Sequence, residues 1–177
     1  NALGGLDNPD SGELHIDQQN ITQLNKSQLA DLRLNHIGFV FQAYNLVPVL
    51  SAQENIEFVM EVQGIPSEER KRLSLAILKE VGLEGLEHRR PAELSGGQQQ
   101  RVAVARAIVT SPTLVLADEP TANLDSDSVT QLMDLFQQLN RERKVTFVIS
   151  THDERVIHYA RRLIRMVDGK IVSDQNK

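Results

Sequence analysis

The sequence lacks cysteine and long apolar runs. None of its 177 residues is cysteine, which excludes disulfide bonds and thiolate metal sites and is compatible with a reducing compartment. No apolar stretch approaches the ~18–20 residues that a helix needs to cross a bilayer. Residues 1–10 contain no basic segment followed by an apolar core, so they do not predict a signal peptide.

An excess of positive charge is also missing. The chain has 19 Lys and Arg against 24 Asp and Glu, which gives a formal net charge of −5. This balance provides no electrostatic reason to expect binding to nucleic acid or to an anionic membrane surface, and we expect no nucleic-acid partner. No internal repeat or low-complexity tract is present. The length suits one domain with a sizeable core.

The stretch from Leu94 to Pro120 holds a turn that could bind phosphate. It begins with residues 95–97, Ser-Gly-Gly, directly before a helical pattern. Glycine has no Cβ, so its backbone N–H groups can approach a phosphate closely. The helix that follows adds the positive end of its dipole at the same place. A lone turn of this kind is more often structural, so the residues that follow it decide its interpretation.

Two acids close the same stretch. Residues 114–117 form an apolar run without alternation, which is typical of a strand buried on both faces of a parallel sheet. Asp118 and Glu119 come directly after it, and open α/β sheets bind ligands at the carboxyl ends of their strands. The stretch therefore predicts a phosphate-binding turn together with a metal ligand and a general base.

The remaining sequence predicts alternating strands and helices. Strands are expected over residues 13–16, 37–41, 145–149, 163–167 and 170–172, and helices over residues 28–34, 52–62, 68–81, 126–139 and 154–160. Ser27, Ser51 and Ser67 are the expected N-caps of the first three helices, and Asp153 that of the last. This rhythm predicts a parallel sheet. We expect residues 145–149 to be a buried strand and the hairpin around residues 168–169 to add an antiparallel edge to that sheet.

These motifs resemble those of the ATP-binding cassette (ABC) ATPases. Residues 94–98 match the signature of that family, and residues 114–119 match its Walker B strand with the catalytic glutamate. The resemblance implies an α/β fold of the P-loop NTPase (RecA-like) type, with a mostly parallel sheet and an inserted α-helical subdomain. The expected division is a core over residues 1–43 and 112–177 and a helical subdomain over residues 44–111.

The resemblance also implies roles at the site. ATP hydrolysis requires Mg²⁺, a phosphate cradle and an oriented water. Asp118 is expected to hold Mg²⁺ through a coordinated water, and Glu119 to accept a proton from the attacking water. His152 matches the switch histidine beside the γ-phosphate, although alone it could be a structural strand-end residue. Gln42 matches the glutamine that reaches Mg²⁺ and links the two lobes; out of this context it would be a surface residue.

Further residues imply a dimer. The resemblance implies that the signature residues that bind nucleotide are Ser95, Gly96, Gly97 and Gln98. By resemblance, this group contacts ATP held by a second copy, and Asp125 lies in the loop that crosses to that copy. The implied active unit is a head-to-tail homodimer that is peripheral to the cytoplasmic face of the inner membrane and works with a transmembrane permease subunit.

Several blocks narrow the resemblance within the family. Residues 4–7, 37–42, 94–103, 116–125 and 165–172 look like the lipoprotein-releasing and macrolide-exporting branch, with the cell-division branch a near relative. The expected function is therefore an ATPase subunit that powers export or lipoprotein release. A non-transport ABC ATPase of the cell-division type is the alternative.

One family motif is missing. No G-x-x-x-x-G-K-[ST] sequence occurs, so the chain lacks the loop amides and lysine that hold the β- and γ-phosphates in this family. We expect the chain to be an ABC ATPase truncated at its N-terminus, with an unpaired sheet edge and exposed apolar surface. A third hypothesis follows, in which the chain keeps the signature surface and does not bind nucleotide.

Overall fold

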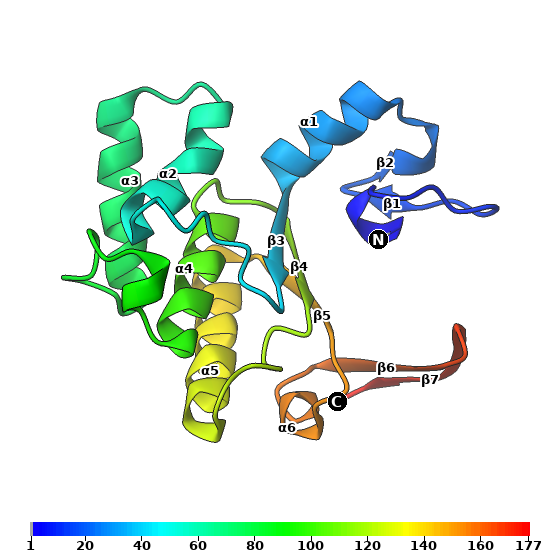
Figure 1. Cartoon of the computed structure of the whole chain (residues 1–177). Coiled ribbons are helices and arrows are strands. Elements are labelled where there is room, and N and C mark those ends of the chain that lie inside the picture. The colour runs from blue at the N-terminus through cyan, green and yellow to red at the C-terminus, as the bar shows by residue number, and fades with distance from the viewer. Residues whose placement is uncertain (1) are drawn as a thin grey trace.

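A three-stranded parallel sheet lies at the centre of the computed structural model, which describes residues 2–177 (Figure 1). Its strands are β3 (Ile37–Phe41), β4 (Leu114–Asp118) and β5 (Thr146–Ser150), in the order β3-β4-β5. All pairs are parallel and in register, so Phe41, Asp118 and Ser150 lie across from one another at the carboxyl ends. The predicted parallel sheet is confirmed.

Four long helices pack on the sheet and on each other. They are α2 (Ala52–Val62), α3 (Ser67–Glu80), α4 (Gly96–Ile108) and α5 (Ser126–Arg143). Their buried side chains form a single apolar core with those of β3 and β4. Figure 1 shows α2 and α3 on the side of α4 away from the sheet, as a helical insertion predicts. The apolar side chains at helical spacing on α5 are all buried: Val129, Leu132, Met133, Phe136 and Leu139.

Helix α4 lies directly against β3 at Gly38. A Cβ built on Gly38 would come within 2.3 Å of the Ala107 carbonyl oxygen of α4. No larger residue fits between these two backbones, so the glycine is required by the close approach of strand and helix.

The predicted N-caps are right in two cases and wrong in two. Ser51 caps α2 in a capping box with Glu54, and Asp153 caps the short helix α6 (Glu154–Ile157). The prediction of Ser27 is wrong, because α1 (Lys26–His36) begins earlier and the side chain of Asn25 accepts the Gln28 amide instead. The prediction of Ser67 as an N-cap is also wrong, because Ser67 is the first residue of α3.

The cap position of α3 is occupied by Pro66, which has no side-chain acceptor. The helix therefore starts without a side-chain cap, and the fixed φ of proline defines its entry instead.

The strand predicted over residues 145–149 is only half buried. In β5, Phe147 and Ile149 pack on the core, whereas the alternate residues are exposed, Val148 to 40%. The prediction of a strand buried on both faces is therefore wrong. The physical reason is that β5 is the edge of the sheet within residues 2–177, and one of its faces is uncovered.

The terminal hairpin forms, but not as an edge of the parallel sheet. Strands β6 (Arg162–Val167) and β7 (Lys170–Asn176) pair with each other in a separate two-stranded sheet. Residues 168 and 169 make the turn between them with positive φ angles of 47° and 73°, as a two-residue hairpin loop requires. The predicted hairpin is confirmed and its predicted attachment is wrong. Its exposed apolar side chains are Ile164, Met166, Val167, Ile171 and Val172.

The first part of the chain forms a small second core. It contains the 3₁₀ turns η1 (Ala2–Gly4) and η2 (Ile21–Gln23) and the short hairpin of β1 (His15–Ile16) and β2 (Gln19–Asn20). The strand expected over residues 13–16 is thus shorter than predicted. Another 3₁₀ turn, η3 (Pro91–Glu93), precedes α4. The second core consists of Ile16, Ile21, Leu29, Leu32 and Ile37.

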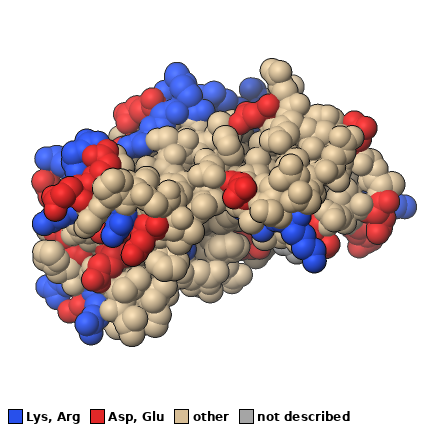
Figure 2. Space-filling model, turned by 90° about the horizontal axis from the view of Figure 1, so that it is seen from above, with Lys and Arg blue, Asp and Glu red and all other residues tan. Residues whose placement is uncertain are grey.

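Charged side chains of both signs lie together over α2 and α3. On the face shown in Figure 2, basic and acidic groups alternate in the left part of the view. Arg70–Glu61 and Arg72–Glu69 are examples of ion pairs within this lobe. No helix in the described part of the chain is long and apolar enough to span a membrane.

Candidate active site

The three parallel strands deliver polar residues to one edge of the sheet, namely the edge formed by the carboxyl ends of the strands. Because Phe41, Asp118 and Ser150 are in register, Gln42, Glu119 and the loop containing His152 follow the strands at neighbouring places. This edge is where a parallel α/β sheet binds its ligands. The structure therefore gathers the four residues that sequence reasoning proposed for the chemistry.

Glu119 is the centre of a hydrogen-bond network. Its Oε1 lies 2.8 Å from Nδ1 of His152, and its Oε2 accepts a hydrogen bond of 3.2 Å from the Thr151 hydroxyl. Its backbone N–H donates to the Ser150 carbonyl at 2.9 Å, and its φ is +46°. A non-glycine residue with a left-handed backbone is uncommon, and such conformations concentrate at functional sites.

The carboxylate of Glu119 raises the pKa of His152 above its usual 6.5, first through the hydrogen bond and then through its charge. His152 is otherwise open, with 85% of its side chain exposed, whereas the Glu119 side chain is 23% exposed. The carboxylate is thus largely shielded from solvent, whereas the histidine bonded to it is exposed.

Asp118 is free to bind a cation. Its side chain is exposed, and no hydrogen bond or ion pair of its carboxylate is found among residues 2–177. No group of three or more His, Asp or Glu side chains that could hold a metal ion is found within the described residues. A single exposed carboxylate is still a ligand that Mg²⁺ can use, because this ion takes one or two protein carboxylates and completes its shell with phosphate oxygens and water. Gln42 is also exposed, and its backbone carbonyl accepts a hydrogen bond of 3.1 Å from the side-chain amide of Asn123.

The Ser-Gly-Gly turn starts α4 with a capping box that the sequence analysis did not identify. Ser95 Oγ accepts from the Gln98 amide at 3.3 Å, and the Ser95 amide donates to Gln98 Oε1 at 2.9 Å. A Cβ on Gly96 would lie 2.9 Å from Tyr44 Oη, and one on Gly97 would lie 2.9 Å from Ser128 Oγ. A side chain at either glycine would therefore require the hydroxyl of Tyr44 or of Ser128 to move.

Asp125 is the N-cap of α5. Its two carboxylate oxygens accept from the amide and the hydroxyl of Ser128, both at 2.9 Å. These hydrogen bonds, that of the amide first, lower the pKa of Asp125 below 3.8. Since Ser128 also lies against Gly97, the loop that carries Asp125 is adjacent to the Ser-Gly-Gly turn.

Sequence reasoning missed a second network behind the histidine. The Thr121 hydroxyl donates to Asp153 Oδ2 at 3.2 Å, and Arg155 pairs with the same carboxylate at 2.8 Å. The hydrogen bond from Arg155 is the main reason that the pKa of Asp153 falls to about 2. Asp153 was predicted only as a helix cap, and no sequence pattern indicated its contact with Thr121.

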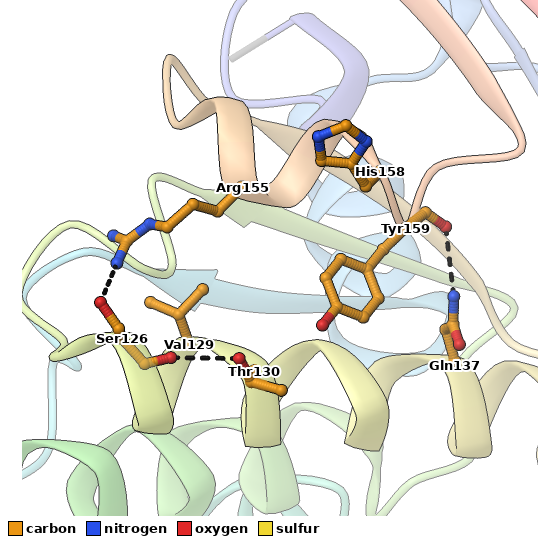
Figure 3. Close-up of a pocket in the computed structure, with 7 residues that line it drawn as sticks. All are labelled: Ser126, Val129, Thr130, Gln137, Arg155, His158 and Tyr159. Carbon is orange, nitrogen blue, oxygen red and sulfur yellow. Dashed lines mark hydrogen bonds between the residues drawn. The ribbon is translucent and has the colours of Figure 1, made fainter.

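A hollow of about 490 Å³ opens between α5 and α6, and Arg155 is one of the residues that line it. In Figure 3, Arg155 reaches across it to Ser126, and Gln137 approaches the Tyr159 carbonyl. It is lined mainly by apolar surface and contains none of the four residues at the sheet edge.

Comparisons with known proteins agree with this geometry. A family model described as "ABC transporter" matches residues 1–122. The chain is 44% identical over 169 residues to the ABC transporter ATP-binding protein YtrE of Bacillus subtilis, covering 96% of this chain and 73% of YtrE. It is 45% identical to the macrolide export ATP-binding/permease protein MacB of Escherichia coli, covering 98% of this chain but only 27% of MacB.

Two further comparisons extend the similarity. The chain is 42% identical to the lipoprotein-releasing system ATP-binding protein LolD of Bacteroides fragilis, covering 96% of this chain and 79% of LolD. The dimeric post-hydrolysis structure of the ATP-binding cassette MJ0796, bound to ADP and Pi, superposes with a TM-score of 0.88 at 40% identity, covering 99% of this chain and 77% of that one. With its fold, its sheet-edge residues and its family match in agreement, the chain belongs to the ABC transporter family of ATP-binding proteins.

Proposed function

We propose that this chain is the ATP-driven part of a transporter that exports a substrate or releases lipoproteins. The observation that carries the proposal is the convergence of Gln42, Asp118, Glu119 and His152 at one edge of the sheet. The similarity to MacB and LolD, one named for macrolide export and the other for lipoprotein release, supports this branch of the family.

Glu119 and His152 are the proposed catalytic residues. Glu119 accepts a proton from the water that attacks the γ-phosphate, a role for which its half-shielded carboxylate is suited. Each of its oxygens has one partner, His152 or Thr151, and keeps a second lone pair that can take up the proton. The exposed histidine is the partner that can move without disturbing the core.

Asp118 and Gln42 are the residues that would hold Mg²⁺ next to ATP. The metal would neutralise phosphate charge, which is the main demand of phosphoryl transfer. The exposed carboxylate of Asp118 would bind the cation directly or through a coordinated water. Gln42, at the end of the neighbouring strand, would add a neutral amide oxygen.

The Ser-Gly-Gly turn is proposed to act on ATP held by a second copy of the chain. Its nucleotide-contacting residues are Ser95, Gly96, Gly97 and Gln98. The helix start offers backbone N–H groups and a positive dipole end to a phosphate. Asp125, next to this turn, is placed to contribute to the same interface. The dimeric state of MJ0796 supports a homodimer here.

A transmembrane permease subunit is the proposed membrane partner. Apolar side chains are exposed near the start and along the length of α2: Val49 is 69% exposed, Phe58 51% and Val62 58%. Contiguous exposed apolar surface marks interaction sites, and Phe58 and Val62 are neighbours one turn apart on α2. We assign them to a permease contact at the cytoplasmic face of the membrane, with residues 44–111 as the contacting helical subdomain and residues 1–43 and 112–177 as the ATPase core.

Two other functions compete with this proposal. A cell-division ABC ATPase would use the same site with a different membrane partner. A non-binding remnant is favoured by one specific observation, the absence of a G-x-x-x-x-G-K-[ST] sequence from the 177 residues.

Equilibrium binding of fluorescent ATP tests the proposal. The chain is measured alone and after addition of about 30–40 residues that carry the strand, phosphate loop and helix start of a relative. We expect Mg²⁺-dependent binding only by the extended chain. Absence of binding by a folded extended chain would favour the remnant, and tight binding by the 177 residues alone would show that the phosphate loop is dispensable.

A further inference from the structure

A guanidinium from α4 holds the backbone that follows Gln42. Arg106 Nη2 donates to the Tyr44 carbonyl at 3.0 Å, and Nη1 donates to the Asn45 carbonyl at 2.6 Å. No ion pair within residues 2–177 includes Arg106. Burial lowers the pKa of its guanidinium. A half-buried arginine without a carboxylate is costly, so its two carbonyl partners account for its place.

The segment that Arg106 holds is strained. Tyr44 and Asn45 both have left-handed backbones, with φ angles of 60° and 50°. For a bulky residue such as tyrosine this conformation is rare and persists only when its surroundings enforce it. Two consecutive left-handed residues turn both carbonyls toward α4, where the planar fork of one guanidinium binds them together.

Tyr44 connects this segment to the Ser-Gly-Gly turn. The backbone carbonyl of Tyr44 is bound by Arg106 near the C-terminal end of α4, and its side-chain hydroxyl lies beside Gly96 at the N-terminal end of the same helix. Burial raises the pKa of Tyr44 above 10.0. Tyr44 therefore lies along α4 and contacts the start of the signature helix, while Gln42 is only two residues away in the chain.

We infer that Arg106 is a positioning residue. By holding the carbonyls of Tyr44 and Asn45 it fixes the direction of Gln42 and keeps the phenol of Tyr44 against Gly96. This inference rests on the proposed function for the roles of Gln42 and the signature turn. The positioning itself is a property of the 177-residue chain and can be measured without nucleotide.

The test compares Arg106→Met with Arg101→Met in the 177-residue chain. Arg101 is on the same helix, but its guanidinium bonds to Gln131 of α5 instead. Native-state hydrogen exchange is followed at the Tyr44 and Asn45 amides, which donate to Phe41 and Ala43. Amides of β3 serve as the internal reference for global opening. We expect exchange about tenfold faster or more in Arg106→Met, because the held turn opens locally, and no selective change in Arg101→Met.

A second readout separates positioning from general stability. The chain has two tyrosines, so 3-fluorotyrosine labelling gives two ¹⁹F signals, and Tyr159→Phe assigns the one from Tyr44. We expect this signal to move toward the solvent-exposed position in Arg106→Met and to be partly restored in Arg106→Lys, which can bind one carbonyl. If Arg106→Met does not fold, Arg106→Lys carries both measurements.

Unchanged exchange at Tyr44 and Asn45 together with an unchanged ¹⁹F signal in a folded Arg106 variant would overturn the inference. An equal effect in Arg101→Met would do the same. Because no nucleotide is present, a failure of ATP binding in the previous experiment leaves these results unaffected, and the two proposals fail independently.

Discussion

At the scale of single residues, the pair of Glu119 and His152 determines the character of the site. Sequence reasoning placed both residues at the ends of buried strands, and the parallel register brings them together. It did not predict their direct contact, because His152 was expected beside a phosphate. The 2.8 Å contact depends on the left-handed turn at Glu119, which no neighbouring sequence pattern specifies.

This pair predicts a pH dependence. A histidine whose pKa is raised in the folded state contributes stability below its unfolded pKa, and that contribution is lost as the pH rises through the folded pKa. For His152 the loss begins above 6.5. Titration of the His152 ring by NMR should give a midpoint above that of a model peptide.

The same titration has a matched pair of variants. Glu119→Gln should return the His152 midpoint toward 6.5, because the carboxylate causes the shift. Glu154→Gln, also near the histidine in sequence, should leave the midpoint in place. A midpoint unaffected by Glu119→Gln would mean that the two side chains are apart in solution.

At the scale of secondary-structure elements, the spacing of apolar residues predicted the bounds of those elements whose burial follows from their own sequence. The strand at residues 37–41 and the helix at residues 52–62 have the bounds that their apolar patterns indicated, and the strand expected over residues 114–117 extends one residue further, to Asp118. Serine as a cap was a weaker guide. Nearby Asn25 competes for the start of α1, and the choice depends on which residue leaves the helical conformation first. The burial of β5 could not be predicted, because it depends on neighbours that are distant in the sequence.

The cap of α2 gives a test at this scale. Ser51→Ala removes the acceptor of the Glu54 amide and should destabilise the fold by about 1 kcal/mol, a fall in melting temperature of roughly 2–4 °C for a chain of this size. Ser67→Ala is the control, since Ser67 lies inside α3 and caps nothing. Thermal unfolding followed by circular dichroism compares the two, and equal shifts would deny the cap its role.

At the scale of the whole molecule, the hairpin β6–β7 is the least integrated part. It pairs with no strand of the parallel sheet within the described chain and carries several exposed apolar side chains. The turn residues and apolar runs of the sequence predict that β6 and β7 pair with each other. Whether the hairpin joins the parallel sheet depends on which other elements lie next to it, and this is not encoded locally. The uncovered face of β5 has the same origin.

This surface predicts self-association of the 177-residue chain. Met166 and Ile171 are 60% and 64% exposed, and apolar surface of this kind promotes non-specific association. Met166→Thr with Ile171→Thr should lower the concentration-dependent increase in sedimentation coefficient. Val49→Thr with Phe58→Thr, on the distant α2 side, is the matched comparison. Equal reduction by both pairs would assign the association to apolar surface in general rather than to the hairpin.

The contact of Gly38 with Ala107 has a mechanical consequence. With no side chain between them, β3 and α4 cannot slide past one another without collision of their main chains. We therefore expect the strand that delivers Gln42 and the helix that begins after Ser95 to move together at this contact. The contact ties the segment behind the glutamine to the helix behind the signature serine.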